Sequence, residues 1–332
     1  MKKNYVTYIV LLILIAVAAL FSLNFGVVSI SPGEVWQTII GSGTPKQELV
    51  LFDIRMPSIV LAILVGAAMA VSGVILQAIT NNELADPGIL GINSGAGLAV
   101  VLYIAFFQTS VSGFSQSQTF VLPLCAFGGA LLTAAIIVLI SWKGGFDTIR
   151  VILVGIGINA GFSALLIALQ LKMDPIDFMK AVVWLSGDLW ATQWKYVWAI
   201  LPWLVVLIPF VVYKSRSLNV LQLGTVIATG LGISVLRERL VLLVLAVALA
   251  GLGVSAGGGI AFLGLIAPHI ARRIVGPKHQ VLLPVAALIG ALILLTADTI
   301  GRNIVQPMEL PAGIIVALVS APYFIYLLMK SK

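Results

Sequence analysis

The sequence predicts an all-α membrane protein of about ten transmembrane helices, and three observations support this fold class. Of its 332 residues, 61% are hydrophobic and only 9% are charged, whereas soluble domains contain about 45–50% apolar and about 25% charged residues. The mean hydropathy is +1.15, and a soluble domain of that composition would precipitate. Because a helix needs about 20 apolar residues to cross a bilayer, the length allows about ten spans. Residues 1–332 are expected to form one integral membrane domain.

Ten apolar segments, bounded by charged residues, Pro, Gly or Asn, predict the individual spans. The first follows Met1, Lys2 and Lys3 as the core of a signal peptide would, but no small-residue cleavage pattern follows Leu20, which favours a membrane helix. The eighth is too short to cross the bilayer unaided. The segments are residues 5–23, 57–80, 89–107, 119–142, 149–171, 195–213, 240–256, 260–271, 281–300 and 310–329.

The distribution of Lys and Arg predicts the orientation, because these residues are enriched in cytoplasmic loops. With the N-terminus in the cytoplasm, thirteen of the 19 basic residues fall on the cytoplasmic side. The even number of spans then returns the C-terminus to the cytoplasm, and the expected compartment is the bacterial plasma membrane. The basic residues left outside are Lys46, Arg55, Lys172, Lys180, Lys195 and Arg302.

Two outer connections are longer than a helical hairpin needs, and both have recognisable local structure. In the first, Ser31 can cap a helix, Pro32 suits the first helical position and Glu34 can complete a capping box, which predicts a short surface helix. The second, residues 172–194, mixes acidic residues with Trp184 and Trp190. This pattern fits a short interfacial helix with aromatic anchors, although a plain surface loop explains it equally well.

Small residues recur at the spacing of helix-packing faces, where they allow two backbones to approach closely. A further glycine cluster in residues 251–259 precedes the short eighth segment and predicts a broken helix, which is tolerated at membrane depth where protein or a water-filled cavity surrounds it. The packing pairs are Gly66 with Ala70, Gly91 with Gly95, and Gly253 with Gly257.

Charged side chains near the middle of a span mark ion-coupled transporters, and the predicted spans have none there. Asp298 falls near the outer end of its span, and Asn93 and Asn159 fall near inner ends. A proton-driven or sodium-driven transporter is therefore disfavoured. The chain also lacks a G-x-x-x-x-G-K-[ST] phosphate loop, so a nucleotide that drives it would be bound by a partner.

The loop between the sixth and seventh spans, residues 218–240, is the expected contact with such a partner. It reads as two short helical pieces broken around Gly230 and Gly232, with Arg237 and Arg239 at the start of the next span. An ordinary basic cytoplasmic loop is the alternative reading of the same residues.

Catalytic motifs are absent from the sequence. Neither His269 nor His279 belongs to a metal-ligand or nucleophile motif, and a Ser255–His269 intramembrane protease pair is disfavoured because neighbouring glycines and prolines explain both residues structurally. The single cysteine, Cys125, lies in an apolar stretch and excludes a disulfide framework. No enzyme activity, metal site or cofactor is expected on this chain.

Several separated motifs, in order along nearly the whole chain, resemble the iron-siderophore and cobalamin permeases of the FecCD family. The first block comprises Arg55-Met56-Pro57, Gly66-Ala67-Ala68, Ser72-Gly73, Gln77, Asn82, Leu84-Ala85-Asp86-Pro87 and Leu90-Gly91. The middle block comprises Leu223-Gly224, Ala228 and Leu231-Gly232. The last block comprises Gly258, Ile260, Phe262, Gly264-Leu265, Pro268-His269, Arg272, Pro284, Asp298, Arg302, Glu309-Leu310-Pro311, Gly313 and Pro322.

The resemblance implies a type II ABC importer: two ten-helix permeases around a central path, two cytoplasmic ATPases that hold ATP and Mg²⁺, and an extracellular substrate-binding lipoprotein. It implies that Arg55 and Arg302 dock the binding protein through surface ion pairs. The ATPase-coupling residues that it implies are Leu223, Gly224, Ala228, Leu231, Gly232, Arg237 and Arg239. The candidates for the translocation path or its gating are Gln77, Asn82, Asp86, Pro87, Asn93, Gly258, Pro268 and His269.

The expected function is ATP-driven import of iron-siderophore complexes through the permease. A cobalamin or haem importer of the same family and, less favoured, an ion-coupled secondary transporter remain alternatives. Some positions depart from the family pattern: Glu83 and Gly259 stand where Pro is common, and Thr225 and Val226 stand where acidic residues are common. These departures favour pairing with a non-identical permease over a homodimer.

Overall fold

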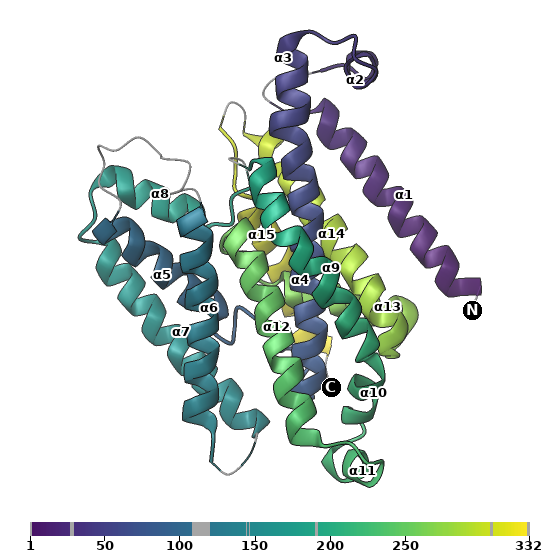
Figure 1. The fold of residues 1–332 in the computed structure, drawn as a ribbon, viewed down its shortest axis with the longest axis vertical. Coiled ribbons are helices and arrows are strands. Elements are labelled where there is room, and N and C mark those ends of the chain that lie inside the picture. Colours follow the sequence, from purple (N-terminus) through teal and green to yellow (C-terminus); the bar gives the residue numbers. More distant parts are fainter. Residues whose placement is uncertain are drawn as a thin grey trace.

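The computed structural model describes residues 2–26, 30–107, 120–143, 145, 147–189, 192–305 and 308–330, and within these ranges it contains helices and no strands (Figure 1). In chain order the elements are α1 (Lys2–Asn24), α2 (Pro32–Ile39), α3 (Pro45–Glu48), the π-helix η1 (Leu49–Arg55), α4 (Met56–Thr80), α5 (Ile92–Phe107), α6 (Val121–Ser141), α7 (Thr148–Gln170), α8 (Pro175–Leu185), α9 (Trp194–Tyr213), α10 (Ser215–Leu221), α11 (Thr225–Gly230), α12 (Val235–Gly257), α13 (Leu263–Val275), α14 (His279–Ile304) and α15 (Ala312–Lys330).

The all-α membrane fold predicted from the sequence is confirmed. Each of the ten predicted apolar segments contains one helix: α1, α4, α5, α6, α7, α9, α12, α13, α14 or α15. Among the described residues, seven helices are long and apolar enough to cross a membrane, and α5 and α15 contribute shorter apolar stretches. The predicted eighth segment corresponds to α13, which has only 13 residues.

Helix α4 forms the centre of the bundle. It continues α3 and η1 without a break from Pro45 to Thr80. Of the residues in an 18-residue apolar stretch of this long helix, 78% are buried. In η1 the winding loosens to the π form, so that the N–H of Met56 donates to the carbonyl of Leu51. Figure 1 shows this long helix projecting beyond the other helices, where it carries α2 and α3 at its end.

Close backbone contacts join α4 to its neighbours, as the small-residue pairs predicted. A Cβ atom on Gly66 would lie 2.4 Å from the carbonyl oxygen of Gly290 in α14, and one on Gly73 would lie 1.8 Å from that of Gly264 in α13. Gly253 in α12 likewise faces Met69 of α4. The backbone contacts of Gly66 and Gly73 therefore require glycine at these two positions.

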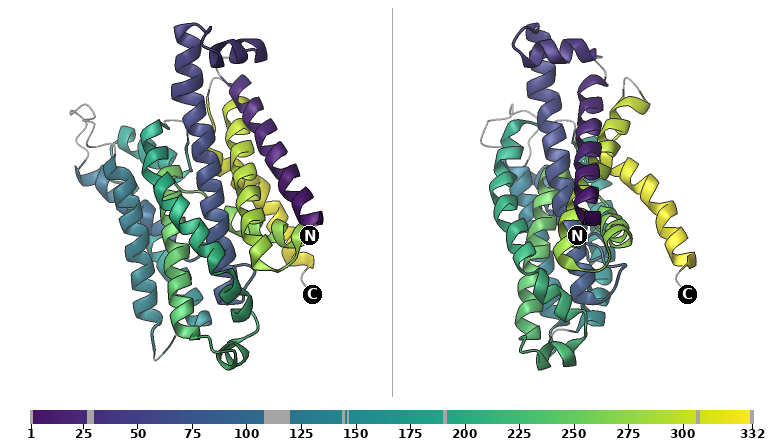
Figure 2. Two further views of the ribbon diagram at one scale, coloured as in Figure 1. Left: turned by 45° about the vertical axis from the view of Figure 1, so that its right-hand side comes forward. Right: turned by 90° about the vertical axis from the view of Figure 1, so that its right-hand side faces the viewer.

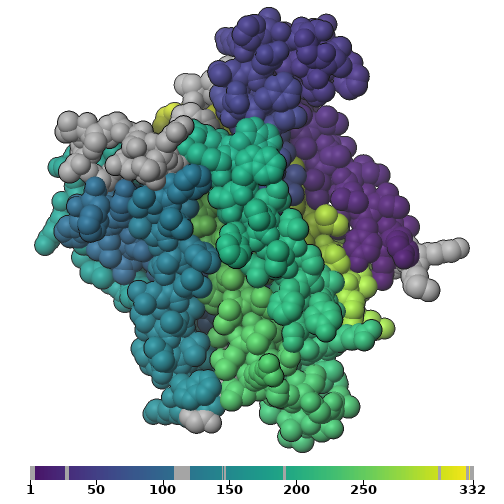
Figure 3. Space-filling view, in the orientation of Figure 1, coloured from purple at the N-terminus to yellow at the C-terminus, as the bar shows by residue number. Residues whose placement is uncertain are grey.

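Two parts of the bundle leave apolar surface uncovered. Helices α5 to α8 pack together on one side of the molecule (Figures 1 and 3). Of the residues in an 18-residue apolar stretch of α7, only 17% are buried. Helix α15 leaves the bundle at an angle in the right-hand view of Figure 2. Its residues Leu318 and Val319 are exposed.

The predicted broken helix lies between α12 and α13 and is confirmed. Helix α12 ends at Gly257, Gly258 has a φ of 68° and Phe262 adopts the left-handed conformation before α13 begins. A Cβ atom on Gly258 would lie 2.3 Å from the carbonyl oxygen of Trp184, at the end of α8. The interrupted backbone is thus surrounded by protein, as such a segment at membrane depth requires.

Both predicted surface helices are present. In α2 the backbone N–H of Glu34 donates to the Ser31 hydroxyl, and the Glu34 carboxylate accepts from the Ser31 N–H at 2.8 Å, which completes the capping box. The Ser31 hydroxyl also donates to the Glu34 carboxylate at 2.7 Å, and this bond and the one from the Ser31 N–H lower the pKa of Glu34. Helix α8 is the second of them, and its Trp184 is half-buried, whereas Trp190 falls outside the described residues.

Residues 218–240 contain two short helical pieces, as predicted, but the break between them lies at a different position from the predicted one. The chain breaks at Gln222–Gly224 between α10 and α11, where Gly224 has a φ of 94°. Gly230 and Gly232 instead end α11 and form the turn that leads into α12. A left-handed residue ends a helix most cheaply when it is glycine, and three glycines in this loop left the choice of break open.

Candidate functional site

The side chains singled out from the sequence gather at the two ends of the bundle. At the end that carries α2 lies a cluster of buried charges, which we call the outer cluster: Arg55, Asp298, Arg302 and Glu309. At the opposite end lie the connection from α4 to α5, the adjoining face of α13, and helices α10 and α11. We call residues Ser215 to Ser234 the coupling segment.

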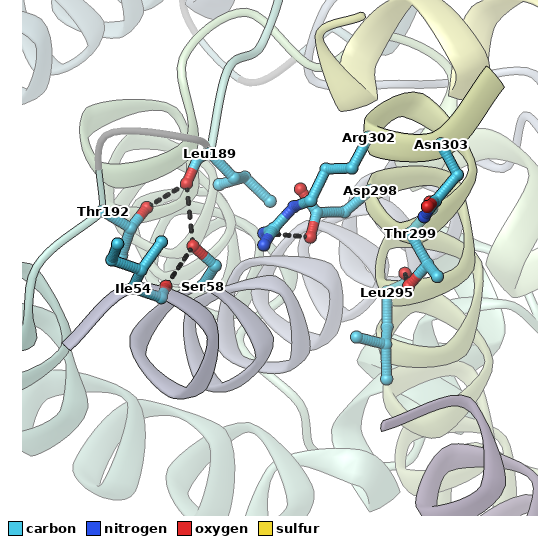
Figure 4. Close-up of polar contacts among 9 residues, drawn as sticks. All are labelled: Ile54, Ser58, Leu189, Thr192, Leu295, Asp298, Thr299, Arg302 and Asn303. Carbon is cyan, nitrogen blue, oxygen red and sulfur yellow. Dashed lines mark hydrogen bonds and ion pairs between the residues drawn. The ribbon is translucent and has the colours of Figure 1, made fainter. Parts of the chain in front are cut away.

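The outer cluster contains a buried ion pair within α14. Arg302 donates from Nη2 to Oδ2 of Asp298 at 2.5 Å, one helical turn away (Figure 4). Both side chains are less than 10% exposed. Because taking charges out of water is costly, such residues are stable in a protein interior only when they are paired.

Arg55 and Arg302, which sequence analysis assigned to docking of a binding protein, are neighbours in space. Arg55 donates from Nη1 to the backbone carbonyl of Leu23 at the end of α1, and the charges of Arg302 and Glu309 act on it. However, only 4% of Arg55 and 6% of Arg302 is exposed. In this conformation the chain supplies its own acceptors to both guanidinium groups, and their assignment to docking stays a prediction.

Glu309 joins this cluster from the connection between α14 and α15. Burial raises the pKa of its carboxyl group, and the nearby charge of Arg302 opposes that shift. Its Oε2 atom is buried without a hydrogen-bond partner. In the sequence Glu309 is only part of a motif, because nothing in a linear sequence brings it next to Arg55.

The segment that follows α8 is fastened to α4 beside the outer cluster. Ser58 donates to the carbonyl of Leu189 at 3.1 Å, and Thr192 donates to the same carbonyl at 2.5 Å (Figure 4). Trp194 adds a bond from its indole N–H to the carbonyl of Phe52 at 2.7 Å. These contacts fix the path of the chain over the outer end of the bundle.

At the opposite end, Arg272 of α13 connects two elements. Its Nη1 atom lies 2.8 Å from Oε1 of Glu83, and its Nη2 donates to Oε1 of Gln77 at 3.2 Å. The ring of His269 lies 4.0 Å from the Glu83 carboxylate and packs edge-on against Tyr323. The predicted path residues Gln77 and His269 are thus brought together, with Gln77 buried between α4 and α13.

The connection from α4 to α5 folds back on itself under α13. Asp86 is 2% exposed and accepts the N–H of Gly88 at 2.7 Å, and burial raises the pKa of its carboxyl group to about 6. Asn82 accepts the N–H of Leu84 in a local turn. Pro87 lies against Gly264, at the start of α13. These three candidates thus make contacts that hold the loop in its folded conformation.

The remaining path candidates lie at or near the interrupted region between α12 and α13. Asn93 donates to the carbonyl of Ile260 at 3.0 Å. Gly258 belongs to the break itself, and Pro268 is buried inside α13. Gly258 also lines the cavity described below, and the assignment of these residues to the path stays a prediction.

The coupling segment protrudes from the end of the bundle (Figures 1 and 3). Four of its apolar side chains point outward: Val226 is 87% exposed, and Leu223, Ile227 and Leu231 are all more than half exposed. Ala228 is buried, and Gly224 and Gly232 provide the turns. Arg237 is exposed, whereas Arg239 is buried against the bundle.

A cavity of about 730 Å³ opens on the side of the molecule between α6, α8, α9 and α12. Its walls are mainly apolar, with Met179, Trp184 and Tyr196 among the larger side chains, and Lys180 and Asp188 add the charges. Within the described ranges, no group of three His, Cys, Asp or Glu side chains is placed to hold a metal ion. Cys125 is half-buried.

Comparison with known proteins agrees with this architecture. The model of the FecCD transport family matches residues 12–330. The chain belongs to the FecCD transport family.

Individual FecCD relatives cover the chain from end to end. It is 55% identical, over 331 residues that span 98% of the relative, to the iron(3+)-hydroxamate import system permease protein FhuG of Bacillus subtilis. It is 38% identical to the Fe(3+) dicitrate transport system permease protein FecD of Escherichia coli, over 100% of both chains. A solved ABC transporter assigned to the metal-chelate type, in an inward-facing conformation, superposes with a TM-score of 0.85 at 31% identity, covering 98% of this chain and 99% of its own.

Proposed function

We propose that this chain is the transmembrane permease subunit of an ATP-driven importer that takes up iron bound to hydroxamate siderophores. Identity to the relative named for iron-hydroxamate import is 55%, against 38% for the relative named for dicitrate. The ferric chelate would be cargo, and no cofactor would reside on this chain. ATP and Mg²⁺ would be held by separate ATPase subunits.

The observation that carries the proposal is the apolar surface of the coupling segment. Four large aliphatic side chains, two on α11 and two in the turns on either side of it, point away from the bundle, at the end assigned to the cytoplasm by the distribution of basic residues. An isolated exposed apolar residue is ordinary, but a group at a protruding tip is typical of a protein interface. A groove on an ATPase is the partner that fits, and its closure would push this segment.

The uncovered faces of α7 and α15 would meet a second permease, with the translocation path between them. Gly157 and Gly161 of α7 have nothing within 4 Å of the position of a Cβ atom, which gives a smooth, uncharged wall. Such a wall holds a bulky chelate weakly. A non-identical second permease is favoured, because Glu83 and Val226 depart from the family pattern.

An extracellular binding lipoprotein would deliver the chelate at the outer cluster. Since Arg55 and Arg302 are paired internally, docking would exchange those partners for carboxylates of the binding protein. The N- and C-termini would both lie in the cytoplasm, with the protein in the bacterial plasma membrane.

Uptake by the complete complex in proteoliposomes tests the proposal. Ferric hydroxamate should accumulate only when ATP is present on the coupling-segment side, and a protonophore or sodium ionophore should leave uptake unchanged. Uptake that persists without any ATPase, or that an ionophore abolishes, would instead indicate an ion-coupled transporter. Competition by haem or cobalamin at equal concentration would reassign the ligand.

The substitution Ile227→Asp tests the coupling surface directly. A charge there should prevent co-purification of the ATPase, because an unpaired carboxylate would be buried in the interface. The exposed Ile149, at the start of α7 near the same end of the bundle, provides the control: Ile149→Asp should leave ATPase binding unchanged.

A further inference from the structure

Helix α14 begins without a cap of its own. Its N-cap residue, Lys278, makes no side-chain hydrogen bond to the first turn, although the first backbone N–H groups of a helix have no acceptor within that helix. An acceptor comes instead from α10, 60 residues earlier in the chain: Oδ1 of Asn219 accepts the backbone N–H of His279 at 3.0 Å. The coupling segment therefore caps α14.

The same asparagine makes two further contacts with the start of α14. Its Oδ1 atom lies 2.8 Å from Nδ1 of His279, and its Nδ2 donates to Oε1 of Gln280 at 2.8 Å. Because Oδ1 can only accept, the imidazole Nδ1 carries the proton and donates to it. All three polar contacts are thus satisfied by one amide group in one orientation.

The contact is buried on the histidine side. His279 has no exposed surface, and the neighbouring α10 residues Leu218 and Leu221 are also fully buried. A hydrogen bond in such surroundings resists competition from water. The start of α14 and the face of α10 are therefore held together as one packed unit.

Helix α14 connects this unit to the outer cluster. At about 1.5 Å per residue, its 26 residues span about 39 Å, and its outer part carries Asp298 and Arg302. Along its length it packs on α4, with Gly66 and Gly290 in direct backbone contact. A displacement of its first turn would be carried along the helix toward the outer end.

We propose that Asn219 is a positioning residue of transport: its amide group joins the coupling segment to the first turn of α14, so that the two move as one body when the ATPase acts. This inference rests on the proposed function. It assigns a role to a residue that the sequence motifs passed over, because Asn219 has no special neighbours in the sequence.

The first test separates ATP hydrolysis from transport in the complete complex. Asn219→Ala should leave ATP hydrolysis within about twofold of the wild type and lower the uptake per ATP by at least about fivefold, the size of a typical coupling between sites. Asn219→Asp keeps the oxygen that accepts from His279, and it should retain coupling. The control Thr296→Ala removes a hydrogen bond that stays within α14 and should retain coupling.

Unchanged coupling in Asn219→Ala, or equal loss in Asn219→Asp, would overturn the assignment. Uptake by the wild-type complex is measured first, with and without ATP. Uptake that does not depend on ATP would contradict the proposed function, whereas the results for the variants test the role of Asn219.

A cross-link provides a second test that does not depend on the folding of Asn219→Ala. In a Cys125→Ala background, Asn219→Cys and Gln280→Cys are joined by a short bis-methanethiosulfonate reagent. Because Asn219→Cys also removes the amide, the reduced complex should take up less per ATP than the wild type. If α10 and the start of α14 move as one body, the cross-link should raise this uptake and reduction should lower it again. Loss of uptake that reduction restores would show that the two must separate during transport, which contradicts the proposal.

Discussion

Lys214, at the end of α9, and Glu238, in the first turn of α12, form an ion pair of 2.7 Å across the base of the coupling segment. Both side chains are about one-fifth exposed or less. The pair closes the loop of chain that contains α10 and α11, and it ties both ends of that loop to the bundle. Together with Asn219, it makes the coupling segment part of the rigid body.

Breaking this pair should destabilise the base of the segment. We expect Glu238→Gln to cost about 1–3 kcal/mol, because Lys214 would lose its charged partner in a largely buried place. Thermal unfolding of the purified protein measures the loss. The charge exchange Lys214→Glu with Glu238→Lys should recover at least half of it, and a double variant no better than Glu238→Gln would argue against the pair.

The buried pair in the outer cluster should be far more sensitive than an exposed one. Asp298→Asn removes the carboxylate that forms the ion pair with Arg302, which costs about 3–5 kcal/mol for a buried pair. Asp147→Asn, which breaks the exposed contact with Arg150 and keeps an N-cap residue for α7, should cost about 1 kcal/mol or less. Chemical denaturation of both variants compares them.

Replacing both members of the buried pair provides the control for that experiment. The double variant Asp298→Leu with Arg302→Met leaves no uncompensated charge, so it should be more stable than Asp298→Asn alone. Equal losses in the two variants would mean that packing, and not charge, decides stability at this position.

The glycine crossings on α4 predict strong effects from a single methyl group. Gly66→Ala and Gly73→Ala would place Cβ atoms 2.4 and 1.8 Å from backbone carbonyl oxygens, and overpacking of this kind costs about 1–3 kcal/mol. Gly128→Ala, in α6, has open space around it and should be neutral or slightly stabilising. The melting temperatures of the three variants are compared with that of the wild type. A Gly73→Ala variant as stable as the wild type would contradict the close approach of α4 and α13.

Asp86 predicts a pH dependence that one substitution should remove. Burial raises the pKa of its carboxyl group to about 6 in the folded protein, above the value of about 3.9 expected in the unfolded chain. The folded state therefore binds the proton more tightly. This group's contribution to stability is greatest below about pH 4 and falls by about 3 kcal/mol as the pH rises past 6.

Asp86→Asn keeps an acceptor for the N–H of Gly88 but cannot ionise. The change in melting temperature between pH 4.5 and pH 7.5 should therefore be more positive in the variant than in the wild type. Asp53→Asn, at an exposed position, should follow the wild-type profile. Parallel profiles for Asp86→Asn and the wild type would show that this carboxyl group has an ordinary pKa in the folded protein.

Local sequence features predicted the elements whose cause is local. The capping box at Ser31 and Glu34 gave α2, the glycine cluster gave the break before α13, and the apolar segments gave the ten helices. The position of the break between α10 and α11 was missed, because Gly224, Gly230 and Gly232 are all compatible with a turn. In the structure the chain turns at both Gly224 and Gly232, and Leu218, Leu221 and Ala228 are buried between and beside these turns.

The contacts that define the candidate site depend on tertiary structure. Arg55 and Arg302 were expected at the surface because both are basic residues in outer positions, yet Leu23 and Asp298 accept from them in the interior. Asn219 reaches His279 across 60 residues, and Glu83 reaches Arg272 across a longer stretch of chain. No periodicity or motif encodes such pairs.

The sequence by itself determined that this chain is a helical bundle of the membrane with few charged residues, because the cost of exposing backbone and charge to lipid depends on composition and segment length alone. Tertiary structure decided which polar side chains are paired, buried or exposed, since a hydrogen bond or an ion pair requires two groups within about 3 Å, and only the packing of α4, α10, α13 and α14 brings those groups together.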